Sequence, residues 1–304
     1  MRRKHLVRGL LAAAVVFGVG VAASPAEDPP EDFWVLRVGI FADLHAHDTN
    51  SPLDAFLMVE WDERLGACVD AMNAWPADLM IQLGDFVNGR FALGAELGNA
   101  DRIAEILAAA DAVYARFDGP RYHVLGNHDV GDLTKAAFLK GVGADALTQS
   151  FDAGGYHFVL LDAQFRLDGS DRANEFWYMQ GCVPPQVLEW LEEDLVATEL
   201  PTIVCLHQRL DLDFEQRTGG PEVANYLEVR AVLEASGDVV AVFQGHDHWG
   251  GYSQIEGIHY VTFSALIGRI GGKEPTWAHV TLDPMARTIE IEGVGEQANY
   301  RLEY

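Results

Sequence analysis

The sequence predicts an α/β fold, and three observations support this prediction. Short apolar runs typical of strands alternate with helical patterns from Trp34 to Gln244, and only strand patterns follow Gly250. Several of the apolar runs end abruptly in acidic or imidazole side chains. With 304 residues, of which 49% are hydrophobic, the chain can bury a large core. No stretch after Asp32 has the composition of a linker, so we expect a single domain.

The predicted strands are short runs rich in β-branched or aromatic residues. In the alternating part they are Trp34–Phe41, Leu79–Leu83, Tyr122–Leu125, a hairpin of Phe151–Asp152 and Tyr156–Asp162, Thr202–Leu206, and Val239–Gln244. In the last part they are Tyr252–Ile255, Ile258–Phe263, Trp277–Leu282 and Thr288–Ile291. The hairpin is expected because Gly154-Gly155 can form its tight turn.

The predicted helices show apolar residues at a spacing near 3.6 residues or begin with helix-initiating residues. They are Asp54–Asn73, Asp101–Arg116, Pro184–Val196 and Val223–Ala235. The third begins with prolines, which the first turn of a helix tolerates because its N–H groups have no partner inside the helix.

The N-terminal segment has the pattern of a signal peptide. We therefore divide the chain into a signal peptide at 1–23, a linker at 24–32 and a folded domain at 33–304. Met1–Arg8 is basic, and the apolar run Gly9–Ala23 is short for a membrane-spanning helix. Small residues before Ser24 favour cleavage there, and an uncleaved anchor is the alternative. We expect an exported protein, periplasmic or extracellular, without a stable membrane anchor.

The charge of the chain limits its partners. It has 21 basic and 46 acidic residues, a formal net charge of −25. An acidic surface argues against binding to nucleic acids or anionic membranes, which requires basic patches. The three cysteines are an odd number without metal-like spacing and indicate no disulfide framework. Cys68 and Cys205 are expected in the core, whereas Cys182 is expected in a loop, either paired or free.

Five predicted strands are followed directly by residues that commonly bind metal ions. The five clusters are Asp43-Leu44-His45, Gly84-Asp85, Gly126-Asn127-His128-Asp129, His207, and Gly245-His246-Asp247-His248. In open α/β sheets, ligands bind outside the carboxyl ends of the strands. Buried carboxylates and imidazoles are costly unless they are paired or bound to a metal. The five clusters therefore predict one shared metal site.

With these clusters the sequence resembles the calcineurin-like metallophosphoesterase superfamily, whose blocks are D-x-H, G-D, G-N-H-[D/E], a lone His and G-H-x-H. All five blocks occur here in this order between Asp43 and His248. The resemblance implies a four-layer α/β/β/α sandwich with two mixed β-sheets. It also implies a dinuclear metal site at the carboxyl ends of the strands, with ions that could be manganese, iron or zinc.

The resemblance also implies a role for each metal-type residue. The implied ligands are Asp43, His45 and His248 for one ion, Asn127, His207 and His246 for the other, and Asp85 for both. A carboxylate has two oxygens, so Asp85 could serve two cations at once. The implied reaction is attack on phosphorus by a hydroxide held between the ions. His128 matches the position that donates a proton to the leaving group or stabilises the transition state.

The second block departs from the protein-phosphatase branch of the superfamily. That branch has an Asp that orients the catalytic histidine and an Arg that binds phosphate, where this chain has Asn88 and Gly89. This difference argues against a phosphoprotein phosphatase. Arg90 follows directly and either contacts the substrate or faces solvent.

Two further residues are candidate substrate contacts. Arg209 could bind phosphate, because a planar guanidinium matches pairs of phosphate oxygens, or could instead pair with Asp211 or Asp213. His47 could face the substrate, support the metal ligands, or be an exposed loop residue.

The sequence thus favours an exported, dinuclear metal-dependent phosphoesterase that hydrolyses small phosphate esters, in the manner of an alkaline-phosphatase-like phosphomonoesterase. The alternatives are a phosphodiesterase or a nucleotide-diphosphate hydrolase that cleaves ADP-ribose or CDP-alcohols, and a non-catalytic metal-binding scaffold. A nuclease is disfavoured by the net charge and by the lack of a basic stripe. The sequence leaves the oligomeric state open.

Overall fold

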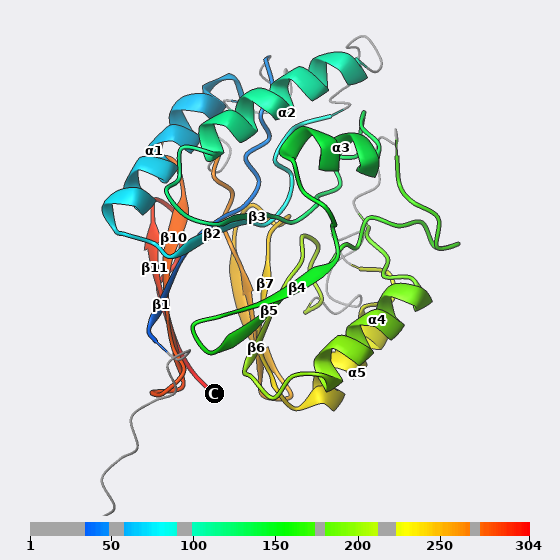
Figure 1. Ribbon diagram of the computed structural model, residues 1–304, viewed down its shortest axis with the longest axis vertical. Helices are drawn as coiled ribbons and strands as arrows, with labels where there is room; N and C mark the ends of the chain where they lie inside the picture. Colours follow the sequence, from blue (N-terminus) through cyan, green and yellow to red (C-terminus); the bar gives the residue numbers. More distant parts are fainter. Residues whose placement is uncertain (1–33, 49–57, 90–98, 174–179, 212–222, 268–273) are drawn as a thin grey trace, which may run out of the picture.

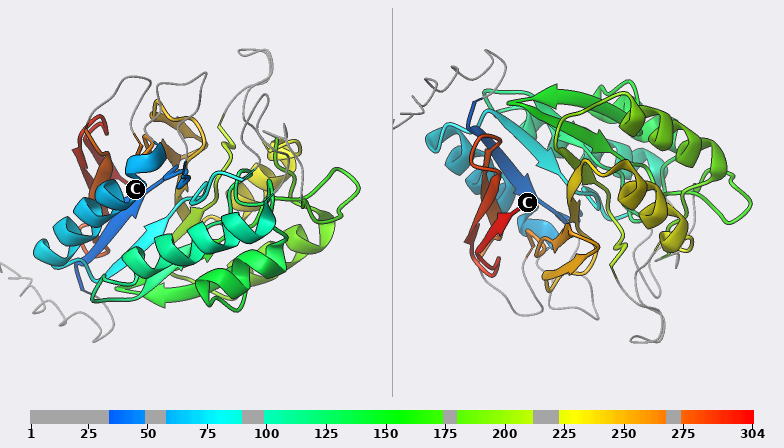
Figure 2. Two further views of the ribbon diagram at one scale, coloured as in Figure 1. Left: turned by 90° about the horizontal axis from the view of Figure 1, so that it is seen from above. Right: turned by 90° about the horizontal axis from the view of Figure 1, so that it is seen from below.

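The computed structural model describes residues 34–48, 58–89, 99–173, 180–211, 223–267 and 274–304. Two six-stranded sheets pack face to face, and helices cover both outer faces (Figure 1). Figure 2 shows the molecule from above and from below, with helices in front of the strands in each view. The predicted four-layer sandwich with two mixed sheets is therefore confirmed.

The first sheet has the strand order β12-β11-β10-β1-β2-β3. Its strands are β1 (Leu36–Phe41), β2 (Leu79–Gln82), β3 (Arg121–His123), β10 (Trp277–Asp283), β11 (Thr288–Val294) and β12 (Tyr300–Glu303). β1, β2 and β3 run parallel to one another, whereas β10, β11 and β12 pair antiparallel. The carboxyl ends of the three parallel strands therefore meet at one edge.

The second sheet has the strand order β4-β5-β6-β7-β9-β8. Its strands are β4 (Gln149–Ala153), β5 (Tyr156–Leu160), β6 (Thr202–Cys205), β7 (Val239–Gln244), β8 (Gly251–Ile255) and β9 (Ile258–Thr262). β5, β6, β7 and β9 are parallel. At the two edges of the sheet, β4 pairs antiparallel with β5 and β8 pairs antiparallel with β9. The predicted hairpin corresponds to β4 and β5.

The helices cover the outer faces of the two sheets. They are η1 (Met58–Glu60), α1 (Trp61–Ala74), α2 (Ala100–Tyr114), α3 (Lys135–Val142), α4 (Pro185–Val196) and α5 (Tyr226–Ser236). Side-chain oxygens of Asn99 and Thr134 accept backbone N–H groups at the starts of α2 and α3, which caps both helices. α1, α2 and α3 pack outside the first sheet and α4 and α5 outside the second (Figure 2).

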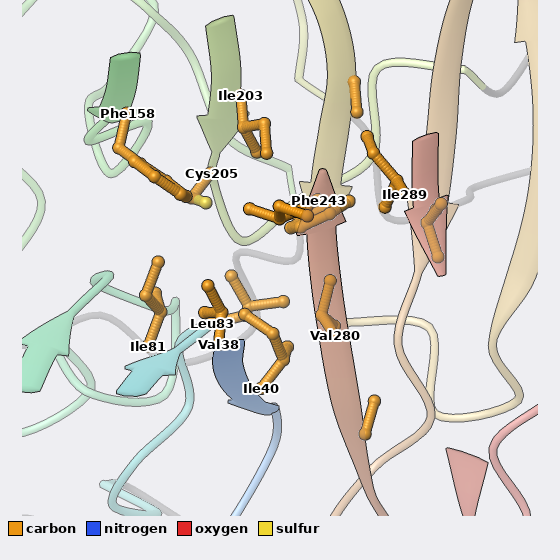
Figure 3. Close-up of a cluster of buried hydrophobic side chains, with 14 of the residues drawn as sticks. Val38, Ile40, Ile81, Leu83, Phe158, Ile203, Cys205, Phe243, Val280 and Ile289 are labelled. Carbon is orange, nitrogen blue, oxygen red and sulfur yellow. The ribbon is translucent and has the colours of Figure 1, made fainter. Parts of the chain in front are cut away.

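The central core lies between the inner faces of the two sheets. Phe158, Phe243, Ile40 and Val280 approach one another from both sheets (Figure 3). Phe243 and Phe263 meet edge-on with ring centroids 5.2 Å apart. β1 and β7 both contribute side chains to this core. Because the core is closely packed, it fixes the distance between these two strands and therefore between the loops that follow them.

Two elements were not among those predicted, namely α3 and β12. The helix predicted from Asp54 begins as α1 at Trp61 after the short η1, and residues 54–57 lie outside the described residues. The strand predicted from Trp34 begins at Leu36, where its pairing with Leu282 of β10 begins; Trp34 and Val35 precede it and are about half exposed. All three cysteines are unpaired and buried, including Cys182.

The predicted signal peptide and linker lie outside the described residues. Among the helices that the structure describes, none combines the length and the apolar character that a bilayer crossing requires.

We expect the central core to dominate stability. Phe158 is fully buried and its ring stacks on Phe151 at 5.1 Å. Phe158→Ala should lower the free energy of unfolding by about 3–5 kcal/mol, because it removes buried apolar area and leaves a cavity. Urea unfolding followed by circular dichroism measures this change. Met285→Ala, at a residue that is 62% exposed, is the control and should change stability by less than about 0.5 kcal/mol. Equal effects of the two variants would contradict this packing.

Candidate metal centre

Five loops meet where the two sheets present the carboxyl ends of their parallel strands. They follow β1, β2 and β3 in the first sheet and β6 and β7 in the second. Backbone hydrogen bonds join neighbouring loops: the Asp43 N–H donates to Gly84 O at 3.0 Å, and the Gly245 N–H donates to His207 O at 3.0 Å. Each predicted ligand thus lies in a loop that directly follows a strand and is tied to a neighbouring loop or strand.

Four of the predicted ligands have left-handed backbone conformations. The φ angles of Asp43, His45, Asp85 and His246 are 54°, 47°, 53° and 66°. This conformation costs about 1–3 kcal/mol for a residue other than glycine and persists only where the surroundings enforce it. Gly84 makes the turn before Asp85 at a φ of 96°, where a Cβ atom would lie 2.4 Å from His207 Nδ1. The strain is concentrated at the site.

The first group of ligands converges on one point. His45 Nε2 lies 3.1 Å from His248 Nε2 and 3.7 Å from Asp43 Oδ1. His248 Nε2 lies 3.4 Å from the same Asp43 oxygen. Two imidazole nitrogens that face each other across 3.1 Å can share at most one proton. Their convergence on a carboxylate is the arrangement that a cation requires.

The second group converges on His207. Its Nε2 atom lies 3.1 Å from Asp85 Oδ2, 3.1 Å from His246 Nδ1 and 3.2 Å from Asn127 Oδ1. All four of these residues are buried. This group therefore offers one carboxylate, two imidazoles and one neutral amide oxygen.

Asp85 lies between the two groups. Its Oδ2 atom is 3.1 Å from His207 Nε2 and 3.6 Å from His45 Nε2, so the same oxygen faces both groups. Its Oδ1 atom accepts a hydrogen bond from the backbone N–H of His128 at 2.8 Å. A ligand that bridges two ions would occupy this position.

Two histidines are oriented by hydrogen bonds on the side away from the centre. His207 Nδ1 lies 2.7 Å from Leu83 O, and His45 Nδ1 lies 2.9 Å from Asn88 Oδ1. A proton on each Nδ1 leaves the Nε2 lone pair for a metal. We expected Asn88 to occupy the position of an acid that orients His128, but its hydrogen bond is to His45.

The two buried acids of the centre depend electrostatically on the histidines around them. Burial alone would raise the pKa of both acids. The imidazoles of His248 and His45 beside Asp43 nevertheless hold its pKa below the usual range, and the charge of His207 does the same for Asp85. Burial would lower the pKa of His207, but Asp85 raises it to about 9. Burial and the neighbouring His207 lower the pKa of His246 to about 3. Burial opposes a charge on His45 as well, but the neighbouring Asp43 and Asp85 raise its pKa, so more than one imidazole compensates the two buried carboxylates.

The donor set fits two transition-metal ions. Among the residues that the structure describes, Asp43 Oδ1 and His246 Nε2 are buried without a hydrogen-bond partner. The groups with mutually close ligand atoms are Asp43, His45 and His248, then His45, Asp85 and His128, and finally Asp85, His207 and His246. Imidazole, carboxylate and amide ligands suit manganese, iron and zinc.

His128 lies at the rim of this centre. Its ring centroid is 4.6 Å from that of His45, and the side chain is partly exposed. Burial lowers the pKa of His128 to about 4. Asp129 anchors the loop, because its two carboxylate oxygens accept the N–H groups of Val87 at 2.9 Å and Gly126 at 2.8 Å. The sequence contained Asp129 in the third block, but only the tertiary contacts show its role.

The three candidate substrate contacts have different surroundings. Arg209 is 9% exposed and forms ion pairs with Asp211 and Asp247. His47 is partly exposed, with its Nδ1 atom 3.5 Å from a carboxylate oxygen of Asp48. Arg90 lies outside the described residues, as does Asp213.

Comparisons with known proteins agree with this geometry. Residues 36–250, more than half of the chain, match the sequence model of the calcineurin-like phosphoesterase family. The chain is 26% identical over 227 residues to a manganese-dependent ADP-ribose/CDP-alcohol diphosphatase of Oryza sativa subsp. japonica, a match that covers 62% of this chain and 68% of the rice protein.

Two solved structures share the fold. A dimetal phosphatase from Danio rerio has a TM-score of 0.72 and 18% sequence identity, over 89% of this chain and 99% of that one. A purple acid phosphatase from yellow lupin has a TM-score of 0.57 and 13% identity, over 90% of this chain and 54% of that one. The family match and the centre point to the same conclusion: the chain belongs to the calcineurin-like phosphoesterase family and is a metal-dependent phosphoester hydrolase.

Proposed function

We propose that this protein hydrolyses the diphosphate bond of small nucleotide derivatives of the ADP-ribose or CDP-alcohol type, and that it uses manganese. The observation that carries the proposal is the 26% identity over 227 residues to the rice diphosphatase, which is named as manganese-dependent. The strongly acidic composition supports a small substrate, since a polyanion would be repelled at long range.

The residues of the centre divide the chemistry among them. When bound, two metal ions would activate a water molecule and polarise a phosphoryl oxygen. Asp43, His45 and His248 would hold one ion and Asn127, His207 and His246 the other, with Asp85 shared. The neutral Asn127 oxygen limits the negative charge of the second group, so an anionic phosphate can approach it.

His128 is placed to assist the leaving group. Asp85 fixes its backbone, and its ring stands beside His45 at the rim. A neutral imidazole still has one N–H that can donate to an oxygen. A bound anionic phosphate would raise the pKa of His128, because a nearby opposite charge favours the protonated form. In either state His128 can stabilise the charge that develops on the leaving oxygen.

The geometry argues against a non-catalytic scaffold. A scaffold has no need to keep seven metal-type residues buried or half-buried around one centre, with four of them in strained backbone conformations. The simple phosphomonoesterase activity that the sequence favoured is the competing outcome of the assay below.

A substrate panel tests the proposed specificity. Metal-stripped protein is reloaded with manganese, zinc or iron and given ADP-ribose, bis-p-nitrophenyl phosphate or p-nitrophenyl phosphate. We expect kcat/KM for ADP-ribose with manganese to exceed that for p-nitrophenyl phosphate by about tenfold or more, the effect of one additional hydrogen bond in the transition state. Preference for p-nitrophenyl phosphate would instead identify a phosphomonoesterase. If the metal-loaded protein turned over none of these substrates, the proposed hydrolase activity would be contradicted.

His128→Ala tests the proposed leaving-group role. The variant should keep its bound metal but lose about 10²–10⁴-fold in kcat, the usual contribution of a positioned proton donor. The loss should be greater for an ester with a poor leaving group than for a p-nitrophenyl ester. Metal analysis and steady-state kinetics measure both quantities. His279→Ala on β10 is the control and should keep its kcat. An unchanged kcat in His128→Ala would refute the role.

We further propose that the chain is exported after cleavage of residues 1–23. The proposal rests on the basic and apolar pattern of the N-terminus. Expression of the full chain in a bacterium, followed by N-terminal sequencing of the protein outside the cytoplasm, should give a chain that begins at Ser24. An intact Met1 on protein retained in the cell would contradict export.

A further inference from the structure

Arg209 is the centre of a buried ionic network beside the metal ligands. Its Nε and Nη2 atoms donate to the two carboxylate oxygens of Asp211, both at 2.9 Å. Its Nη1 atom donates to Asp247 Oδ2 at 3.0 Å. The Arg209 side chain is 11% exposed, compared with 1% for Asp211 and 5% for Asp247. A planar guanidinium that forms a paired contact with one carboxylate and a single contact with another has a fixed orientation.

The Asp211 end of this network is anchored to the second sheet. Asp211 also accepts hydrogen bonds from Ser253 Oγ at 2.7 Å and Gln244 Nε2 at 3.2 Å. Gln244 ends β7 and in turn accepts the N–H of Leu210 at 2.6 Å. The carboxylate that orients Arg209 is therefore held by β7 and β8.

The other end of the network lies between two predicted ligands. Asp247 separates His246, which belongs to the His207 group, from His248, which belongs to the Asp43 group. Arg209 itself follows His207 by two residues. One guanidinium thus joins the loop after β6 to the loop after β7, and those two loops carry ligands for both ions.

We propose that Arg209 is a positioning residue for the metal centre and acts through Asp247, rather than a contact for the phosphate of the substrate. Three of its N–H donors are already used on two buried carboxylates. Its removal would leave both carboxylates buried without their shared cation, and the Gly245–His248 loop would shift to relieve their repulsion. Because His246 and His248 flank Asp247, the shift would weaken both metal sites together.

Manganese binding separates a positioning role from a substrate contact. Titration calorimetry with manganese alone is performed on metal-stripped wild-type protein, Arg209→Met, Arg209→Lys and Asp247→Asn. We expect Arg209→Met and Asp247→Asn to bind manganese about 10–100-fold more weakly, the usual effect of removing a residue that orients metal ligands. Arg209→Lys keeps the charge but not the paired contact, so its loss should be smaller. Arg116→Met removes an exposed Arg116–Asp70 pair and is the matched control.

Kinetics with ADP-ribose complete the test. At saturating manganese the variants should keep the KM of the wild type and regain most of its kcat. A raised KM with unchanged manganese affinity would show that Arg209 contacts the substrate, and this result would overturn the proposal. Unchanged KM together with unchanged manganese affinity would also overturn it. If circular dichroism shows that Arg209→Met does not fold, the same measurements on Arg209→Lys and Asp247→Asn test the proposal. The inference rests on the proposed function only for the kinetics, because an inactive wild type that binds manganese would refute the function and leave the binding test intact.

Discussion

The metal centre depends on the compensation of two carboxylates, Asp43 and Asp85, that are buried within it. Asp43 and Asp85 are 0% and 1% exposed, and the imidazoles around them, His45 and His207 with raised pKa values, offset their charges. Two divalent ions would compensate the charge of both carboxylates. They would also give a partner to Asp43 Oδ1 and His246 Nε2, which are buried without a hydrogen bond. Both acids, together with His45 and His246, have left-handed backbone conformations in the turns at the carboxyl ends of the strands, and such strain persists only where the surroundings enforce it.

The layered fold provides the rigidity that such strained turns require. The central core fixes the distance between the two sheets, and each sheet supplies part of the ligand set. Outside the ligands, a further shell sets their orientation: Leu83 and Asn88 hold two imidazoles, Asp129 holds the loop of His128, and Arg209 connects the two loops of the second sheet.

The sequence predicted the strands well, because each depends on a short local pattern, and the structure brings the residues of the five predicted clusters together at one edge. Val239–Gln244 has the predicted bounds. By contrast α3 has only eight residues, and β12 buries only Leu302 and forms by pairing with β11, a contact that local patterns do not encode. The partner of Asn88 and the network of Arg209 also depend on loops from distant parts of the chain.

The central claim is that the five loops hold two metal ions that share Asp85. Anomalous diffraction from crystals grown with manganese tests it most directly. We expect two anomalous peaks about 3.5–4 Å apart, one beside His45 and His248 and the other beside His207 and His246, with Asp85 Oδ2 in contact with both. A single peak, or manganese bound away from Asp85, would contradict it.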